Sequence, residues 1–408
     1  MSETSTHASA ASHANADGAF PKLLCVAMTV EPTPTAMAFV VKNLLAKIPP
    51  ERVVIAAERT PANPPSQTHD TNGVRIEFVC RKWTWPKRGL RYVAWLRWLV
   101  LPITAWKLAR LAKRERVDAL FVNFPHEYLL FASYLAAGWT GIPLLPYLHN
   151  TYRENRTGLA RRLAGWLQPR VFARAATVFT MSRGMNELLE PMYPGVRFRP
   201  IPHTFAGDVP PFEEPPVVDP RDVRLGFMGS INESNLEALR RVCETVNARP
   251  RFRLTFFSNS PVWFCKKEGL VGPRIDYETP GDDELLERMR SCDLLVLPHG
   301  FTGGFSAAEY ATIFPTRTVL YFLSRRPSLV HAPTDCFYTR WIAERDCAAI
   351  VDRPDATALG DALERLADDP TERSRLVAQG LSAVRSFQID EVMSVFASDL
   401  RDALAKTS

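Results

Sequence analysis

The sequence predicts an α/β protein of two domains, each a mostly parallel sheet covered by helices. The chain has 408 residues, and a single hydrophobic core stops growing at roughly 250–300 residues. Apolar strand-like runs alternate with helical patterns along almost the whole chain, the order typical of parallel sheets. The alternation stops once, at residues 206–222. This segment has five prolines and shows neither an apolar strand-like run nor a helical pattern.

In the first half, apolar runs predict strands and the segments between them predict helices. The strands are expected at 22–29, 53–57, 74–79, 118–124, 142–149, 176–182 and 196–202. The helices are expected at about 35–47, 90–116, 127–138, 157–174 and 184–192.

The second half repeats this order. Strands are expected at 223–230, 253–258, 274–277, 292–298, 328–333 and 348–352, and helices at about 233–247, 282–290, 315–324, 355–367, 370–386 and 388–405. We therefore divide the chain into a disordered leader (1–20), a first domain (21–205), a Pro-rich linker (206–222), a second domain (223–387) and a terminal helix (388–408).

The composition is ordinary for a globular protein, with 46% apolar and 23% charged residues, and its net charge of +6 suits anionic partners. The seven cysteines form no C-x-x-C pair. This favours a reduced, cytoplasmic protein with neither a disulfide framework nor a zinc site. The leader has no apolar core, so we expect no signal peptide. No uninterrupted apolar run is long enough to predict a membrane span.

Polar residues at strand ends are the candidate ligand-binding residues, because ligands of open parallel sheets bind beyond the carboxyl ends of strands. His149 ends the strand at 142–149, and an imidazole that is neutral to cationic near neutral pH suits phosphate or hydroxyl groups. His203 ends the run at 196–202 and could face the space between the domains. Gly229 and Ser230 form a turn where backbone could approach a phosphate. A capping or packing role remains the alternative for each.

The densest group of candidates lies in residues 298–333. Gly303 and Gly304 allow close backbone approach. Pro315 suits the first turn of a helix, which would place Thr316, Arg317 and Thr318 at its N-terminus. Hydroxyls, free N–H groups and one guanidinium would converge there, a combination that suits a diphosphate. An ordinary Pro–Thr helix cap is the alternative.

The string FPTRTVLYFLSRRPSLVHAP (314–333) resembles the donor-site segment of family 4 glycosyltransferases, which typically runs Pro-Thr-Lys, a short helix with Glu-Tyr-Leu, Gly-x-Pro and an apolar strand. Shorter segments agree in order: the strand ending in His149–Asn150, FTMS (179–182), RPIPH (199–203), FMGS (227–230) and DLLVLP (293–298). The resemblance covers roughly residues 22–400.

The resemblance implies the GT-B fold, in which two Rossmann-like domains face each other across a cleft and the last helix crosses back to the first domain. It implies hexosyl transfer with retention from a nucleoside diphosphate sugar, which is a co-substrate rather than a cofactor, with no structural need for a metal. The donor would bind mainly to the second domain and a glycan or lipid-linked acceptor mainly to the first. Arg317 falls where the family often has a phosphate-facing lysine, and His149 where it has a histidine near the reacting sugar.

The chain also departs from the family pattern. Two glutamates that many members carry fall on Thr312 and Leu320, and Glu309 is the nearest substitute for the first. Two alternatives therefore stay open: a sugar-nucleotide epimerase on the same fold, and a catalytically silent protein that binds a nucleotide sugar or a partner transferase.

Residues 81–116 are strongly basic, with eleven Lys or Arg, one acidic residue and five tryptophans. Such a segment can lie in a membrane interface, so we expect a peripheral contact with the anionic inner face of a membrane. A solvated basic face over a Trp-containing core is the alternative. No nucleic-acid-binding motif accompanies the charge, so no nucleic-acid partner is expected.

Overall fold

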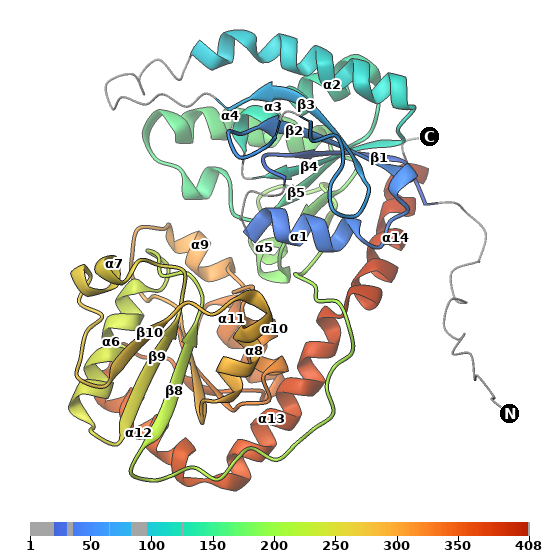
Figure 1. Ribbon diagram of the computed structural model, residues 1–408. Coiled ribbons are helices and arrows are strands. Elements are labelled where there is room, and N and C mark those ends of the chain that lie inside the picture. Colours follow the sequence, from blue (N-terminus) through green and yellow to red (C-terminus); the bar gives the residue numbers. More distant parts are fainter. Residues whose placement is uncertain (1–19, 31–35, 65, 83–95, 125, 407–408) are drawn as a thin grey trace, which may run out of the picture.

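The structure is a computed structural model that describes residues 20–30, 36–64, 66–82, 96–124 and 126–406 (Figure 1). Most of the predicted leader and residues 83–95 of the basic segment lie outside these ranges. The described chain forms two parallel β-sheets, one in each half of the sequence. This confirms the predicted fold class.

The first sheet has seven strands in the order β3-β2-β1-β4-β5-β6-β7. The strands are β1 (Leu23–Ala27), β2 (Val53–Arg59), β3 (Arg75–Arg81), β4 (Ala119–Phe124), β5 (Leu144–Leu148), β6 (Val178–Thr180) and β7 (Phe198–Pro200). Every residue of β1, β4 and β5 is buried, as expected for strands covered on both faces.

The second sheet has six strands in the order β10-β9-β8-β11-β12-β13. These are β8 (Val223–Met228), β9 (Phe252–Phe257), β10 (Ile275–Glu278), β11 (Leu294–Pro298), β12 (Ser328–His331) and β13 (Ala349–Val351). In both sheets the chain starts near the middle, builds outward to one side and then returns to build the other. This order creates a switch point next to the first strand of each sheet.

Helices cover the sheets in chain order. Those of the first half are α1 (Ala36–Leu45), α2 (Leu101–Glu115), α3 (Glu127–Thr140), α4 (Gly158–Arg174) and α5 (Arg183–Leu189). Those of the second half are α6 (Leu236–Ala248), α7 (Val262–Lys267), α8 (Asp282–Arg290), α9 (Ala307–Thr312), α10 (Thr318–Leu323), α11 (Phe337–Arg345), α12 (Ala356–Asp368), α13 (Pro370–Val384) and α14 (Ile389–Ala405). No helix within the described ranges is long and apolar enough to cross a membrane.

Three of these helices, α7, α9 and α11, were not expected from the sequence. Two of them have only six residues, too few to show a clear helical period. The prediction for the helix at 315–324 was wrong at its start, because α10 begins at Thr318 with Arg317 as its N-cap. Pro315 and Thr316 therefore precede the helix.

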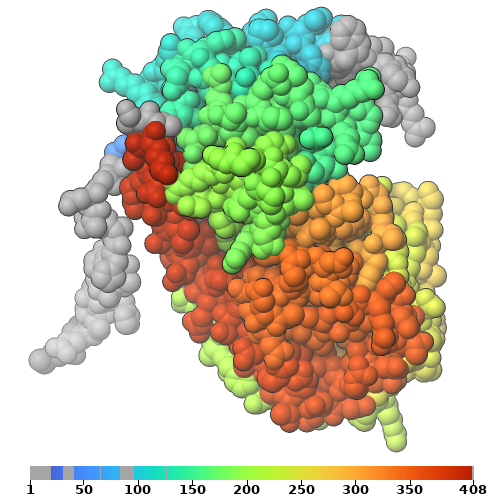
Figure 2. Space-filling model, turned by 180° about the vertical axis from the view of Figure 1, so that it is seen from behind, coloured from blue at the N-terminus to red at the C-terminus, as the bar shows by residue number. Residues whose placement is uncertain are grey.

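The terminal helix α14 returns from the second domain and packs on the first sheet (Figures 1 and 2). Its apolar face joins the same core cluster as β1 and β2. The Phe396 ring lies 5.6 Å from that of Phe121 and 5.3 Å from that of Phe179. The start of the helix is fixed by backbone hydrogen bonds from Phe205 N to Phe387 O and from Ile389 N to Phe205 O. The two halves are thus joined by the linker and by α14.

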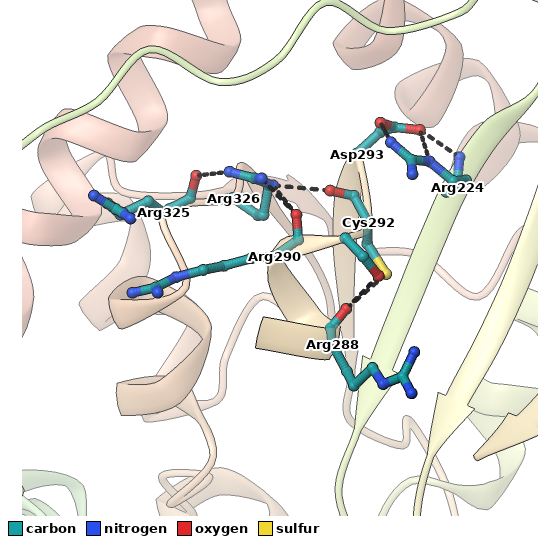
Figure 3. A network of polar contacts seen from close by, with 8 residues as sticks. Arg224, Arg288, Arg290, Cys292, Asp293, Arg325 and Arg326 are labelled. Atoms are coloured by element: carbon teal, nitrogen blue, oxygen red, sulfur yellow. Dashed lines mark hydrogen bonds and ion pairs between the residues drawn. The ribbon is translucent and has the colours of Figure 1, made fainter. Parts of the chain in front are cut away.

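A group of arginines fixes the amino ends of β8 and β11 (Figure 3). The buried Asp293 carboxylate accepts hydrogen bonds from the Arg224 guanidinium at 2.8 and 3.1 Å and from the Arg224 backbone N–H at 2.8 Å. Arg326 donates to the carbonyl oxygens of Arg290 and Cys292. These contacts align the two central strands, and their opposite, carboxyl ends form the candidate site.

Replacing Phe396 with alanine should detach α14 from the first sheet. The ring is 1% exposed, and truncating a buried phenylalanine costs about 3–5 kcal/mol. We expect a loss of this size in the free energy of unfolding, measured by urea denaturation. Val395→Ala is the matched control, because Val395 is the preceding residue of the same helix and is 57% exposed. Equal losses in the two variants would contradict the packing described.

Candidate functional site

The switch point of the second sheet lies between β8 and β11, and two candidate residues follow these strands directly. Gly229 follows β8 and His299 follows β11. Gly229 has φ +130°, a conformation that side chains disfavour. A Cβ atom there would also lie 2.8 Å from Nη1 of Arg317. Only glycine at this turn lets the guanidinium lie over the end of β8.

Arg317 is held over this turn without a carboxylate partner among the described residues. Its Nη1 lies 3.5 Å from the Met228 carbonyl oxygen, and its guanidinium lies 5.2 Å from the centre of the Phe227 ring. Burial lowers the pKa of Arg317 from its usual value. Even a partly buried guanidinium is costly when it lacks a counter-charge, and a bound anion would remove that cost.

Two further polar side chains near Arg317, those of His299 and Thr318, are buried. The His299 side chain is 1% exposed, and its Nε2 has no hydrogen-bond partner among the described residues. Burial, followed by the charge of Arg317, lowers the pKa of His299 to about 4, so the ring is neutral at pH 7. Thr318 is fully buried, and its hydroxyl lies beside the buried Tyr338 hydroxyl. Buried polar groups in folded proteins are normally satisfied, so the His299 Nε2 atom is available to a ligand.

The loops after β8 and β11 contact each other. Gly300 N donates to Ser234 O at 2.6 Å, and the Tyr310 hydroxyl donates to Glu233 O at 3.0 Å. A Cβ on Gly304 would lie 1.8 Å from the Glu233 carboxylate, and one on Gly303 would lie 2.0 Å from the Tyr310 hydroxyl. Gly303 is required for this loop contact, because its Cβ would also lie 2.5 Å from the Glu233 carbonyl oxygen, whereas the exposed Glu233 carboxylate beside Gly304 could move aside.

Two predicted residues, Ser230 and Thr316, have exposed side chains near this group. The Ser230 carbonyl accepts a hydrogen bond from Asn235 Nδ2 at 2.9 Å, which fixes the turn after β8. Thr316 lies outside α10, so the expected cluster of three residues at a helix N-terminus is reduced to Arg317 and Thr318.

His149 and His203 form a buried pair in the first domain. Both are 6% exposed, and their ring centres lie 6.4 Å apart. The His149 ring packs on Tyr147 at 4.2 Å, and His203 Nε2 lies 2.8 Å from Met181 Sδ. Burial lowers the pKa of each histidine to about 3. Of the neutral and cationic forms expected for His149 near neutral pH, the fold therefore favours the neutral one, because the interior cannot solvate the charge.

Glu309 joins the two domains. Its side chain is 2% exposed, and the Ser306 hydroxyl caps its helix, α9. One carboxylate oxygen accepts from Asn150 Nδ2 at 2.7 Å. The other accepts from Thr151 N at 2.9 Å and from Thr151 Oγ1 at 2.5 Å. Asn150 directly follows His149, so this carboxylate of the second domain fixes the loop that carries the histidine.

Other contacts support the same junction, in which α9 lies against the first domain (Figure 1). The Ser182 hydroxyl donates to Thr312 O at 2.8 Å, and Arg340 pairs with Glu187 at 2.7 Å. The first contact joins the start of α5 to the end of α9, and the second joins α5 to α11. The domains meet where the segments after β5 and β11 converge.

The structure thus gathers the predicted residues into two groups. Around the second sheet lie Gly229, Ser230, Gly303, Gly304, Thr316, Arg317 and Thr318, and around the first lie His149 and His203, with Glu309 between them. His299 and Glu233 were missed, although His299 could have been selected by the rule that selected His149, since each directly follows an apolar strand. No cluster of potential metal ligands occurs among the described residues.

Replacing Glu309 with glutamine should weaken the junction between the domains. The amide group would oppose one of the donors that now face a carboxylate, and a buried donor without an acceptor costs about 1–3 kcal/mol. We expect a loss of this size in urea denaturation and a larger radius of gyration in small-angle X-ray scattering. Glu344→Gln, at a side chain that is 70% exposed, should change neither. If the E309Q protein keeps the wild-type free energy of unfolding and radius of gyration, the carboxylate contributes no more to the domain junction than an amide does.

The buried histidines should make stability depend on pH. The folded-state pKa values of His149, His203 and His299 lie below that of an exposed histidine, about 6.5. Between the folded-state pKa values and pH 6.5, the unfolded chain therefore binds more protons than the folded protein. The free energy of unfolding is thus highest above pH 6.5 and decreases as the pH falls. Each histidine should cost about 2 kcal/mol at pH 5.

Urea midpoints at pH 7.5 and pH 5 test this dependence. The wild-type protein should lose stability on acidification, and His149→Asn should lose less than the wild type over the same interval. Identical losses in the two proteins would show that His149 is not held neutral in the fold.

Comparison with known proteins gives one family match and many similar folds. Residues 39–204 match the family described as glycosyl transferase 4-like domain. No curated protein matches the sequence significantly.

Solved structures resemble almost the entire chain. Sucrose-phosphate synthase from Thermosynechococcus elongatus aligns with 95% of this chain and 100% of its own, at 13% identity and a TM-score of 0.68. Anabaena HepE in complex with UDP aligns with 93% of this chain and 99% of its own, at 11% identity and a TM-score of 0.65. α,α-Trehalose 6-phosphate synthase from Burkholderia multivorans aligns with 95% of this chain and 98% of its own, at 13% identity and a TM-score of 0.63.

HepE has also been solved in complex with UDP-glucose. At these identities, the structural likeness concerns the fold. Residues 39–204 thus resemble a glycosyl transferase 4-like domain, and the described chain has the GT-B fold, with two Rossmann-like domains and a last helix that crosses back to the first.

Proposed function

We propose that this protein transfers a hexosyl unit, with retention, from a nucleoside diphosphate sugar to a glycan or lipid-linked acceptor in the synthesis of a cell-surface polysaccharide or glycolipid. The observation that carries the proposal is Arg317, a partly buried cation over the switch point of the second sheet with no carboxylate partner among the described residues. A diphosphate placed there would supply the missing negative charge.

Arg317 would stabilise the nucleoside diphosphate as it leaves the sugar, because a preorganised cation is worth most where charge develops. The Gly229 turn would allow the phosphates to approach the end of β8. The unpaired His299 Nε2 and the Thr318 hydroxyl would complete the hydrogen bonding of the donor. The Glu233 carboxylate would accept hydrogen bonds from the hydroxyl groups of the donor. The UDP complexes of HepE make UDP-sugars the first donors to test.

His149 would contact the transferred sugar as a neutral imidazole, through the Nε2 atom that lacks a partner. A neutral ring can donate or accept a hydrogen bond, depending on its tautomer. Glu309 was expected to touch the sugar, but its carboxylate is occupied by Asn150 and Thr151. We therefore assign it a positioning role, in which it holds the His149 loop against the donor domain.

The acceptor would bind mainly to the first domain. The seven cysteines are free, which suits a reducing compartment, and we place the reaction in the cytoplasm at the inner face of the membrane.

A silent nucleotide-sugar-binding protein is the second candidate, and the two departures from the family pattern favour it. Thr312 uses its hydroxyl within α9 by donating to Ala308 O at 2.9 Å, and Leu320 is apolar. Neither position offers a carboxylate to the donor. This candidate predicts donor binding with no turnover under any acceptor, whereas an epimerase would convert the donor without an acceptor.

Arg317→Ala should reduce turnover at least about 100-fold, the usual scale for removing one group that stabilises developing charge. It should also abolish the thermal shift that the matching nucleoside diphosphate produces in the wild type. The assay compares UDP, GDP, ADP and TDP and their common sugars, without added metal. Arg353→Ala, at an exposed arginine, is the control and should behave as the wild type.

The two readouts separate the candidates. Nucleotide binding that depends on Arg317, together with sugar transfer, supports the transferase. The same binding with no turnover would support the silent protein. Full turnover by R317A with its fold intact would contradict the role assigned to Arg317.

A further inference from the structure

The outward face of α2 carries an exposed stripe that changes from apolar to basic along the chain. Leu99, Ile103 and Trp106 are 67%, 55% and 52% exposed. They are spaced by four and three residues, and so lie on one side of the helix and its preceding turn. Arg110 and Lys113 continue the same spacing and are also exposed. Three large apolar side chains and two cations therefore share one face.

The stripe borders a groove of about 680 Å³ between α2 and α3. Trp106 lines it from α2 and Trp139 lines it from α3, and Trp139 is 51% exposed. Arg110, Lys113 and Arg114 line the basic side of the groove. The surface thus combines two half-exposed indoles with the cations of Arg110 and Lys113, whereas Arg114 is paired with Glu77 and Glu115.

The exposure of this stripe is not a consequence of loose packing. The opposite face of α2 is fully used, since Ala105, Leu108 and Ala112 are completely buried in the core of the first domain. Figure 1 shows α2 at the outer side of the first domain, away from the second domain. A partner on this face would leave the contacts of Glu309 and the site around Arg317 accessible.

We propose that the stripe from Leu99 to Lys113, with Trp139, docks the protein on an anionic phospholipid surface. Leu99 and Ile103 would enter the boundary of the acyl chains, the two indoles would lie at the headgroups, and Arg110 and Lys113 would meet the lipid phosphates. The net charge of +6 favours the same approach. This inference assigns a surface to the membrane placement proposed above, and it does not depend on sugar transfer.

The chemistry of the stripe favours lipid over two other occupants. A soluble polyanion would use the cations but gain nothing from an exposed leucine and isoleucine. A second copy of the chain, related by twofold symmetry, would place like patches together, and Arg110 and Lys113 would repel their equivalents. A lipid surface would contact both the apolar end and the basic end of the stripe.

The test is co-sedimentation of the full chain with vesicles of phosphatidylcholine alone and of phosphatidylcholine with phosphatidylglycerol. The wild type should sediment with the anionic vesicles, and less so as salt is raised. The double variant Arg110→Glu with Lys113→Glu should bind at least about tenfold more weakly, since each basic residue near such a surface contributes substantially. The control Arg221→Glu with Arg353→Glu makes the same change of charge at exposed sites of the second half and should bind far more strongly than that variant.

The double variant Ile103→Ser with Trp106→Ser tests the apolar end and should also bind more weakly. Both side chains are more than half exposed, so the fold should be unaffected, which circular dichroism checks. Three results would overturn the proposal: a wild type that stays in solution with anionic vesicles, equal losses in the two charge-reversal variants, or unchanged vesicle binding by the serine variant. The last would indicate a general polyanion surface.

Discussion

The arrangement of the site depends on one buried carboxylate. Glu309 belongs to the second domain, yet its hydrogen-bond donors, Asn150 and Thr151, belong to the first. A buried carboxylate is tolerated only when it is hydrogen-bonded, so this side chain favours the arrangement in which the segments after β5 and β11 meet. The crossing of α14 onto the first sheet keeps the domains within reach of that contact. The contacts of Glu309 therefore determine both how the two domains pack together and how the site residues are arranged.

The two sides of the junction differ in charge. On the first domain, His149 and His203 are held neutral by burial. On the second, Arg317 keeps a permanent charge because a guanidinium does not lose its proton in proteins. An anionic leaving group would thus meet its cation on one side and a neutral hydrogen-bonding ring on the other. This asymmetry fits a reaction in which negative charge develops on the diphosphate.

The parallel sheets and most helix positions could be predicted because apolar runs and helical periods alternate regularly. Gly229 could be selected by its position at a strand end and Arg317 by its position at the start of a helix, although only the structure shows that the guanidinium needs the absence of a Cβ. The partners of Glu309 lie 158 and 159 residues away in sequence, and no local pattern encodes such a contact. The neutrality of His149 also depends on burial by distant segments. The short helix α9 was missed because six residues within a Gly-rich region carry too little periodicity.

The proposed donor site places a nucleoside diphosphate sugar over the carboxyl ends of β8 and β11. Amide hydrogen exchange of the full chain, with and without UDP-glucose, tests it most directly. We predict slower exchange in residues 229–235, 299–304 and 316–320, with little change around α2. Protection confined to other segments, at a ligand concentration that saturates binding, would contradict the account, because the donor would then be held elsewhere in the protein.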